Sequence, residues 1–212
     1  MQSYGDLMFT PNVRAGQEAE GSAEAFGTRY AKAPDGLGPD EIAFLQSRTS
    51  VYMSTISETG WPYIQHRGGP RGFLKVVSPT QFGFADYRGN RQLVSQGHLV
   101  GNAKTSFFAM DYPQKARLKL QGHARMMPAD SNPELAEKLH TEGQGRVERL
   151  VLVDVEAFDW NCPQFITLRM DQAELAAVVG PEFDRLEARI RALEARIRAL
   201  EAENAALRNA KG

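Results

Sequence analysis

The stretch GFLKVVSPTQFGFADYRGNRQ, residues 72–92, contains two strand-like runs followed by a polar turn. GFLKVV and QFGFAD are rich in β-branched and aromatic residues, and the SPT between them is a Ser-Pro turn signal. The closing RGNRQ needs Gly89 and Asn90 for its backbone geometry, but it does not need a second arginine followed by a glutamine. The extra donors of Arg91 and Gln92 predict an anion-binding turn.

Similar runs lie on both sides of this stretch. SVYMSTIS (50–57) and WPYIQHR (61–67), joined by ETG, predict a hairpin. KTSFFAM (104–110) and ARLKLQGHARMM (116–127) return to strand character, and RLVLVDVEAF (149–158) is expected to close the sheet. Short antiparallel strands with interposed helices favour a small barrel, here of six strands.

Helices are predicted between and before these strands. Residues 39–48, PDEIAFLQSR, begin with a proline and two acids, and residues 93–100 have helix-like apolar spacing. SNPELAEKLHTE (131–142) predicts a capping box of Ser131 and Glu134 with Pro133 in the first turn. Residues 1–48 are expected to form a helical lead-in.

The C-terminal segment repeats EARIRAL at 187–193 and 194–200, followed by the degenerate copy EAENAAL. A seven-residue apolar repeat predicts a coiled coil, with the alternative of a solitary amphipathic helix lying on the domain. The a positions are Ile190, Ile197 and Asn204, and the d positions are Leu186, Leu193, Leu200 and Leu207. β-Branched a residues with leucine at d favour a parallel pair, and the Arg and Glu residues at g and e agree with that pairing.

Composition limits the class of protein. The 212 residues are 42% hydrophobic and 24% charged, which fits one globular domain with an accessory segment. A net charge of -1 and the lack of aromatic platforms argue against a nucleic-acid partner, and no apolar run is long enough to span a bilayer. Because the first residues lack a signal-peptide pattern, we expect a cytoplasmic protein. Cys162 is the only cysteine, and with the four histidines lacking ligand spacing we expect no metal site.

Positive charge is concentrated in one region. Residues 88–125 contain seven Lys or Arg and a single acid, Asp111, although the whole chain is nearly neutral. Arg91 and Gln92 are expected at the start of the next helix, where backbone N–H groups and the helix dipole favour a phosphate. From charge alone, a solvated sheet face is the alternative.

Several motifs in order resemble a known family. YMSTIS, PYIQHRGGPRGFLKV, FGFADYRGNRQ, FFAMDY and RLKLQGHARM, spanning about residues 40–165, resemble the pyridoxamine 5'-phosphate oxidase-like flavoproteins, the FMN-binding split barrels. The resemblance implies a mainly β fold with α elements, namely a six-stranded antiparallel split β-barrel with short helices plus the C-terminal coiled-coil helix. The expected regions are a lead-in at 1–48, the FMN-binding barrel at 49–170 and a parallel dimeric coiled coil at 171–212.

The resemblance also implies the cofactor site. Arg91 and Gln92 would take the place of the family's Arg-Lys pair on the FMN phosphate, although Gln92 supplies no charge. Residues 71–75 would run along the flavin ring, and Arg117 would approach it from the partner subunit of a homodimer. The full set of expected cofactor-binding residues is Gln65, His66, Arg67, Arg71, Phe73, Leu74, Lys75, Asn90, Arg91, Gln92, Arg117, Trp160 and Asn161.

One departure separates the chain from the biosynthetic oxidase. That enzyme ends in an Arg-rich segment that binds its substrate's phosphate, whereas this chain has FDWNCPQFITLRM there, with Arg169 alone. We therefore expect an FMN-dependent oxidoreductase acting on another small molecule, with NAD(P)H or a reductase as electron donor. The alternatives are a flavin- or haem-binding carrier or sensor without turnover, and a deazaflavin-dependent reductase on the same barrel.

Overall fold

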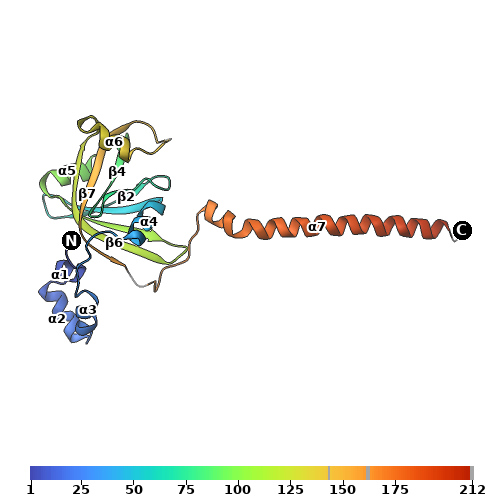
Figure 1. Ribbon diagram of the computed structural model, residues 1–212, viewed down its shortest axis with the longest axis horizontal. Coiled ribbons are helices and arrows are strands. Elements are labelled where there is room, and N and C mark those ends of the chain that lie inside the picture. The colour runs from blue at the N-terminus through green and yellow to red at the C-terminus, as the bar shows by residue number, and fades with distance from the viewer. Residues whose placement is uncertain (143, 161–162, 211–212) are drawn as a thin grey trace. The chain divides into compact units, whose positions relative to one another are not determined.

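The protein is described by a computed structural model that covers residues 1–142, 144–160 and 163–210 (Figure 1). The chain divides into two compact units, Met1–Thr167 and Leu168–Gly212. The first unit contains the sheet and six of the seven α-helices, and the second contains one long helix.

The first unit is built on one antiparallel sheet with the strand order β2-β1-β5-β6-β7-β4-β3. Its strands are β1 (Ser50–Ile56), β2 (Pro62–Gly68), β3 (Lys75–Ser78), β4 (Gln81–Tyr87), β5 (Lys104–Asp111), β6 (Ala116–Pro128) and β7 (Val147–Trp160). No ladder joins the edge strands β2 and β3 in the described ranges, so the sheet is not closed there.

The strand count of six predicted from the sequence is wrong, because all seven strand-like runs form strands. The short β3 pairs with β4 alone and so adds an edge strand. The run expected to close the sheet, β7, is instead an interior strand paired with both β4 and β6.

The sheet packs against a main core that includes Phe82, Phe84 and Phe107 and against a smaller buried cluster of Ala85, Leu139 and Leu150. In β5 the buried residues alternate with half-buried ones, as the two-residue period of a strand requires. Phe82, Phe84 and Phe107 form edge-to-face pairs at the centre of the core, with ring centroids 5.0 and 6.4 Å apart. This packing fixes β4, which carries the polar turn at its end.

Helices α1 (Tyr4–Met8), α2 (Pro11–Ala19) and α3 (Ala23–Arg29) form the start of the chain and lie together near one end of β6 and β7 (Figure 1). Buried Asp159 of β7 attaches them to the sheet. It accepts hydrogen bonds from Tyr30 Oη at 2.6 Å and Arg29 Nη2 at 3.0 Å, and Lys119 Nζ lies 2.8 Å away. The lead-in is therefore fixed by a long-range polar cluster.

We expect Tyr30→Phe to lower the free energy of unfolding by about 1 kcal/mol, because it removes one hydrogen bond to a buried carboxylate. Burial, followed by the Asp159 hydrogen bond, raises the pKa of Tyr30. A raised folded-state pKa means that this stabilisation is complete below the ordinary tyrosine pKa of about 10 and declines as the pH rises beyond it.

Urea unfolding at neutral pH measures the effect. Tyr52→Phe is the matched control, since the Tyr52 hydroxyl makes no hydrogen bond within the described ranges. Equal stability of the Tyr30→Phe variant and the wild type would contradict the anchoring role of the cluster.

Three further helices lie before or between the strands. These are α4 (Pro39–Ser47), α5 (Val94–Gly101) and α6 (Pro133–Leu139), and a 3-10 turn spans Ala129–Ser131. The predicted cap of α6 is wrong by one residue: Asn132 Oδ1 accepts from Leu135 N at 3.0 Å, whereas Ser131 Oγ donates to Pro128 O at 2.6 Å. Asn132 is the cap because the helix begins at Pro133, whereas Ser131 belongs to the preceding 3-10 turn.

The second unit consists chiefly of α7 (Gln172–Asn209), which begins with a capping box of Asp171 and Glu174 and contains Pro181. Its apolar heptad residues are about half exposed in the single chain; Ile190 and Ile197 are each 55% exposed. None of the helices in the described residues is both long enough and apolar enough to cross a membrane.

Candidate functional site

The polar turn after β4 has an unusual backbone. Arg91 and Leu93 adopt φ values of 57° and 58°, in the left-handed region that most side chains avoid. Asn90 Oδ1 accepts a hydrogen bond from Gln92 N at 3.1 Å, which stabilises the turn. Helix α5 begins at Val94, so Arg91 and Gln92 precede it rather than forming its first turn. Leu93, the N-cap, gives the helix no side-chain cap, which leaves its first amides for another acceptor.

The turn borders a polar cleft of about 160 Å³, which we call the turn cleft. Residues from β2, β4, α5, β6 and β7 contribute to it. Its lining residues are Tyr63, Gln65, Arg67, Asp86, Tyr87, Gly89, Asn90, Arg91, Gln92, Leu93, Val94, Ser95, Gln96, Met126 and Arg149.

Two arginines share one carboxylate inside the turn cleft. Arg67 Nη1 lies 3.0 Å from Asp86 Oδ1, and Arg149 Nη2 lies 2.7 Å from Asp86 Oδ2. All three side chains are less than 20% exposed. Burial lowers the pKa of Arg67, and the Asp86 carboxylate opposes that effect. Arg149 Nη1 also lies 3.3 Å from Glu148 Oε2, so the trio continues into a second carboxylate that is shared with Arg91.

Two polar atoms of the turn cleft lack partners. Arg67 Nε and Gln96 Oε1 are buried and form no hydrogen bond within the described residues. Such atoms normally cost free energy unless a ligand or ordered water satisfies them. A ligand that accepts a hydrogen bond from Arg67 Nε and donates one to Gln96 Oε1 would satisfy both atoms.

Arg91 itself is paired with an acid. Its Nη2 donates to Glu148 Oε1 at 2.8 Å, and its side chain is 58% exposed. The hydrogen bond from Arg91 lowers the pKa of Glu148. A phosphate at the turn would therefore compete with this carboxylate for the guanidinium group.

A second cleft, the strand cleft, has a volume of about 240 Å³ and shares Arg67, Asp86 and Tyr87 with the turn cleft. Its lining residues are His66, Arg67, Gly68, Gly69, Pro70, Phe73, Phe84, Ala85, Asp86, Tyr87 and Gln144. Phe73 and Phe84 pack edge to face with ring centroids 6.3 Å apart. A Cβ at Gly69 would lie 2.7 Å from Phe73 Cβ, so glycine is required for this close approach.

The structure gathers seven of the predicted site residues at these clefts: Gln65, His66, Arg67, Phe73, Asn90, Arg91 and Gln92. Asp86, Arg149 and Glu148 were missed. Asp86 and Arg149 are cross-strand partners in the β4–β7 ladder, a pairing that becomes visible only once the register is known.

Five of the other predicted residues lie elsewhere. Arg71 donates to Ser47 O at 2.8 Å, Leu74 is fully buried in the core, and Lys75 is half-buried on β3. The Arg117 guanidinium lies 5.9 Å from the Phe108 ring centroid. Trp160 packs edge to face on Phe44 and donates from Nε1 to Glu41 Oε1, which is the core-packing arrangement. Asn161 lies outside the described residues.

The described residues contain no group of three or more His, Cys, Asp or Glu placed to hold a metal ion. Organic acceptors and anions are the ligands that the arginines, amides and hydroxyls of the two clefts can bind.

Comparison with known proteins gives similarity to solved structures only. No protein-family model matches the sequence, and no curated protein matches it. The chain is similar to HupZ of Group A Streptococcus, at 16% identity over 63% of this chain and 99% of that one, with a TM-score of 0.47.

Two further similar structures carry flavin-related descriptions. One, from Clostridium acetobutylicum, is related to general stress protein 26 in the pyridoxinephosphate oxidase family, with 18% identity, coverage of 56% and 82%, and a TM-score of 0.41. The other is an FMN-binding protein from Syntrophomonas wolfei, with 11% identity, coverage of 57% and 85%, and a TM-score of 0.41. The description of the Clostridium protein names the family that the sequence motifs resemble.

Proposed function

We propose that the chain binds FMN across the turn cleft and the strand cleft and acts as an FMN-dependent oxidoreductase on a small molecule. The observation that supports this most is that a cationic polar cleft and an aromatic-lined cleft share Arg67, Asp86 and Tyr87. Taken together, the two volumes fall in the range of ordinary small-molecule sites, about 300–1,000 Å³.

The turn cleft fits the phosphate end. Arg91 would give charged donors, Gln92 an uncharged one, and the uncapped start of α5 would add backbone N–H groups. Ser95 Oγ donates to Gln65 Oε1 at 2.8 Å and so holds the glutamine of β2 at the edge of the same cleft. Buried Arg67 Nε and Gln96 Oε1 would find partners on the ligand.

The strand cleft fits the ring end. Phe73 and Phe84 supply an apolar wall, and Gly68 and Gly69 let a flat ligand approach the backbone. The guanidinium carbon of Arg67 lies 6.0 Å from the Phe84 ring centroid, between the two clefts. Bound FMN would supply the redox chemistry, and the protein would bind and orient it. Arg67, Arg91 and Arg149 together exceed Asp86 and Glu148 by one positive charge, which would favour negative charge on the ligand.

We also propose a homodimer in which α7 pairs in parallel with its counterpart. In the single chain the a and d residues of α7 are exposed, and Arg189, Arg196, Glu194 and Glu201 make no ion pair in the part of α7 that is described. These are the side chains that a parallel partner would cover and pair. Arg117, remote from both clefts of its own chain, would then be a candidate for the partner's site, as the family resemblance implies.

Glu148→Gln is expected to strengthen FMN binding by about two- to fivefold, the scale of one exposed ion pair. The substitution removes the carboxylate that pairs with Arg91 and would repel the phosphate. Fluorescence titration of FMN gives the affinity, and Glu137→Gln on exposed α6 is the matched control. Weaker binding by the Glu148→Gln variant would contradict a phosphate at Arg91.

Turnover is tested separately from binding. Steady consumption of NAD(P)H by the FMN-loaded protein, above that of free FMN, is the result expected of an oxidoreductase that accepts this donor. Binding of FMN without turnover by NAD(P)H or an added flavin reductase would instead support a carrier or sensor.

A further inference from the structure

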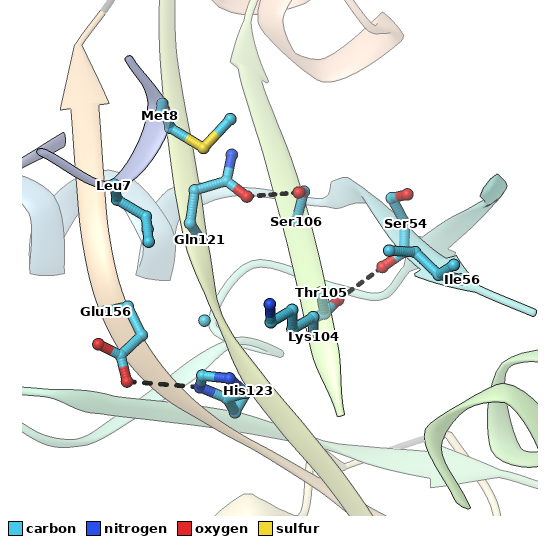
Figure 2. Close-up of a pocket in the computed structure, with 11 residues that line it drawn as sticks. Leu7, Met8, Ser54, Ile56, Lys104, Thr105, Ser106, Gln121, His123 and Glu156 are labelled. Atoms are coloured by element: carbon cyan, nitrogen blue, oxygen red, sulfur yellow. Dashed lines mark hydrogen bonds and ion pairs between the residues drawn. The ribbon is translucent and has the colours of Figure 1, made fainter. Parts of the chain in front are cut away.

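A third space, the α1 cavity, has a volume of about 270 Å³ and lies between helix α1 and strands β1, β5, β6 and β7 (Figure 2). It shares no lining residue with the turn cleft or the strand cleft. Nothing in the proposed flavin site uses it.

A β-bulge builds one wall of the cavity. Gln121 pairs with Ala157 and Gly122 with Val155, so Glu156 is the extra residue of β7. Bulges redirect side chains, and Glu156 lines the cavity. A Cβ at Gly122 would lie 2.2 Å from Asp154 O, so the bulge requires glycine there.

The same bulge also binds the N-terminal segment that covers the cavity. Its free carbonyl, Glu156 O, accepts from Gln2 N at 2.7 Å, and Glu156 Oε2 accepts from Gln2 Nε2 at 3.3 Å. Helix α1 follows two residues later and places Leu7 and Met8 against the cavity. The N-terminal segment therefore encloses the cavity through specific hydrogen bonds.

One lysine, Lys104, lines the cavity as an exposed cation, and the cavity also contains the carboxylate of Glu156. The Lys104 ammonium group has no ion-pair or hydrogen-bond partner among the residues that the structure describes, whereas His123 Nδ1 and Glu156 Oε1 engage each other at 3.4 Å. Gln121 Oε1 accepts from Ser106 Oγ, which leaves the Gln121 amide nitrogen free to donate. Figure 2 shows Lys104 directed towards the space between Gln121 and His123.

The cavity lining also has an apolar part. Leu7 and Met8 of α1 and Ile56 of β1 contribute to it, and Met8 remains 38% exposed. Methionine is flexible and adapts to apolar ligands of different shape. A cation in a cavity that also has an apolar lining is the arrangement that suits an amphiphilic anion.

We propose that the α1 cavity binds a small organic carboxylate with an apolar body. The carboxylate pairs with Lys104 and accepts from the Gln121 amide, while the apolar body packs on Leu7, Met8 and Ile56. The α1 cavity shares no lining residue with the two clefts assigned to FMN, so this proposal does not depend on the proposed function.

The test is an NMR titration of the full chain with ¹³C-methyl-labelled methionine, using sodium octanoate as the probe and 1-octanol as the uncharged probe with the same chain length. Met8 reports on the α1 cavity, and Met126 reports on the turn cleft. We expect a saturable shift of the Met8 methyl signal with octanoate, a much weaker response to octanol, and no change at Met126.

Lys104→Leu is expected to weaken octanoate binding by about tenfold, the scale of a hydrogen bond to a charged group. Lys138→Leu, an exposed residue of α6, is the control and should bind like the wild type. An unchanged signal from buried Met53 would show that each variant is folded. The proposal is overturned by equal affinity for octanol, by binding at Met126 only, by unchanged affinity in Lys104→Leu, or by no saturable shift at millimolar octanoate.

Discussion

FMN affinity is expected to fall roughly 10- to 150-fold when Arg91 is replaced by alanine, corresponding to about 1.5 to 3 kcal/mol for charge-assisted hydrogen bonds. The guanidinium group is the one cation of the polar turn that lines the turn cleft, and the Arg91 backbone is in the left-handed region. Gln92 beside it supplies no charge that could compensate. The dissociation constant comes from fluorescence titration of the apoprotein with FMN.

Arg88→Ala is the matched control for this result. Arg88 belongs to the same turn and carries the same charge, but it is exposed and lines neither cleft. Its removal should change FMN affinity only through the weak, salt-screened field of a surface charge. Equal losses in Arg88→Ala and Arg91→Ala would mean that the turn acts through general charge rather than through a phosphate contact.

The second large effect is expected in α7. The double variant Ile190→Asp/Ile197→Asp should weaken helix pairing by on the order of 10⁴-fold or more, because four buried isoleucines per dimer, at about 1.5 to 3 kcal/mol each, contribute at least about 6 kcal/mol. Each of these isoleucines is 55% exposed in the single chain, so pairing is what would bury them. Pro181 lacks the amide hydrogen that a helical hydrogen bond needs and would disturb helix geometry locally. It lies before both isoleucines, so the heptad register that contains them is uninterrupted.

The measurement is thermal melting of the helical circular dichroism signal at several protein concentrations. A paired α7 gives a transition whose midpoint rises with concentration, and the double variant should lose that dependence while the sheet melts as before. Ala192→Asp/Ala199→Asp places the same charges on the outer c positions and should behave like the wild type. Concentration-independent melting of the wild-type α7 signal would instead favour a solitary helix.

The sequence predicted those parts of the fold that depend on local pattern. The alternation at 104–110 became β5, and the heptad repeat lies in one continuous helix. The order of strands is a long-range property, however. Nothing in the run at 149–158 shows that it would pair with both β4 and β6, so it was expected to close the sheet rather than to lie inside it.

The candidate site was predictable in the same partial way. Arg91 and Gln92 stand out in a turn that does not need them, and both line the turn cleft. Glu148, which pairs with Arg91, comes 57 residues later and meets it only because β4 lies beside β7. Trp160 was expected near the flavin but packs on Phe44 of α4. The sequence alone does not reveal which face of a strand is buried, so it could not tell these two positions apart.

The most direct test of the central claim is the visible absorption spectrum of the freshly purified protein, recorded again after denaturation and separation of the released small molecules. The account predicts a two-band flavin spectrum and the release of FMN, or uptake of added FMN by protein purified without it. A colourless protein that does not take up added FMN would contradict the assignment of the turn cleft and strand cleft as a flavin site.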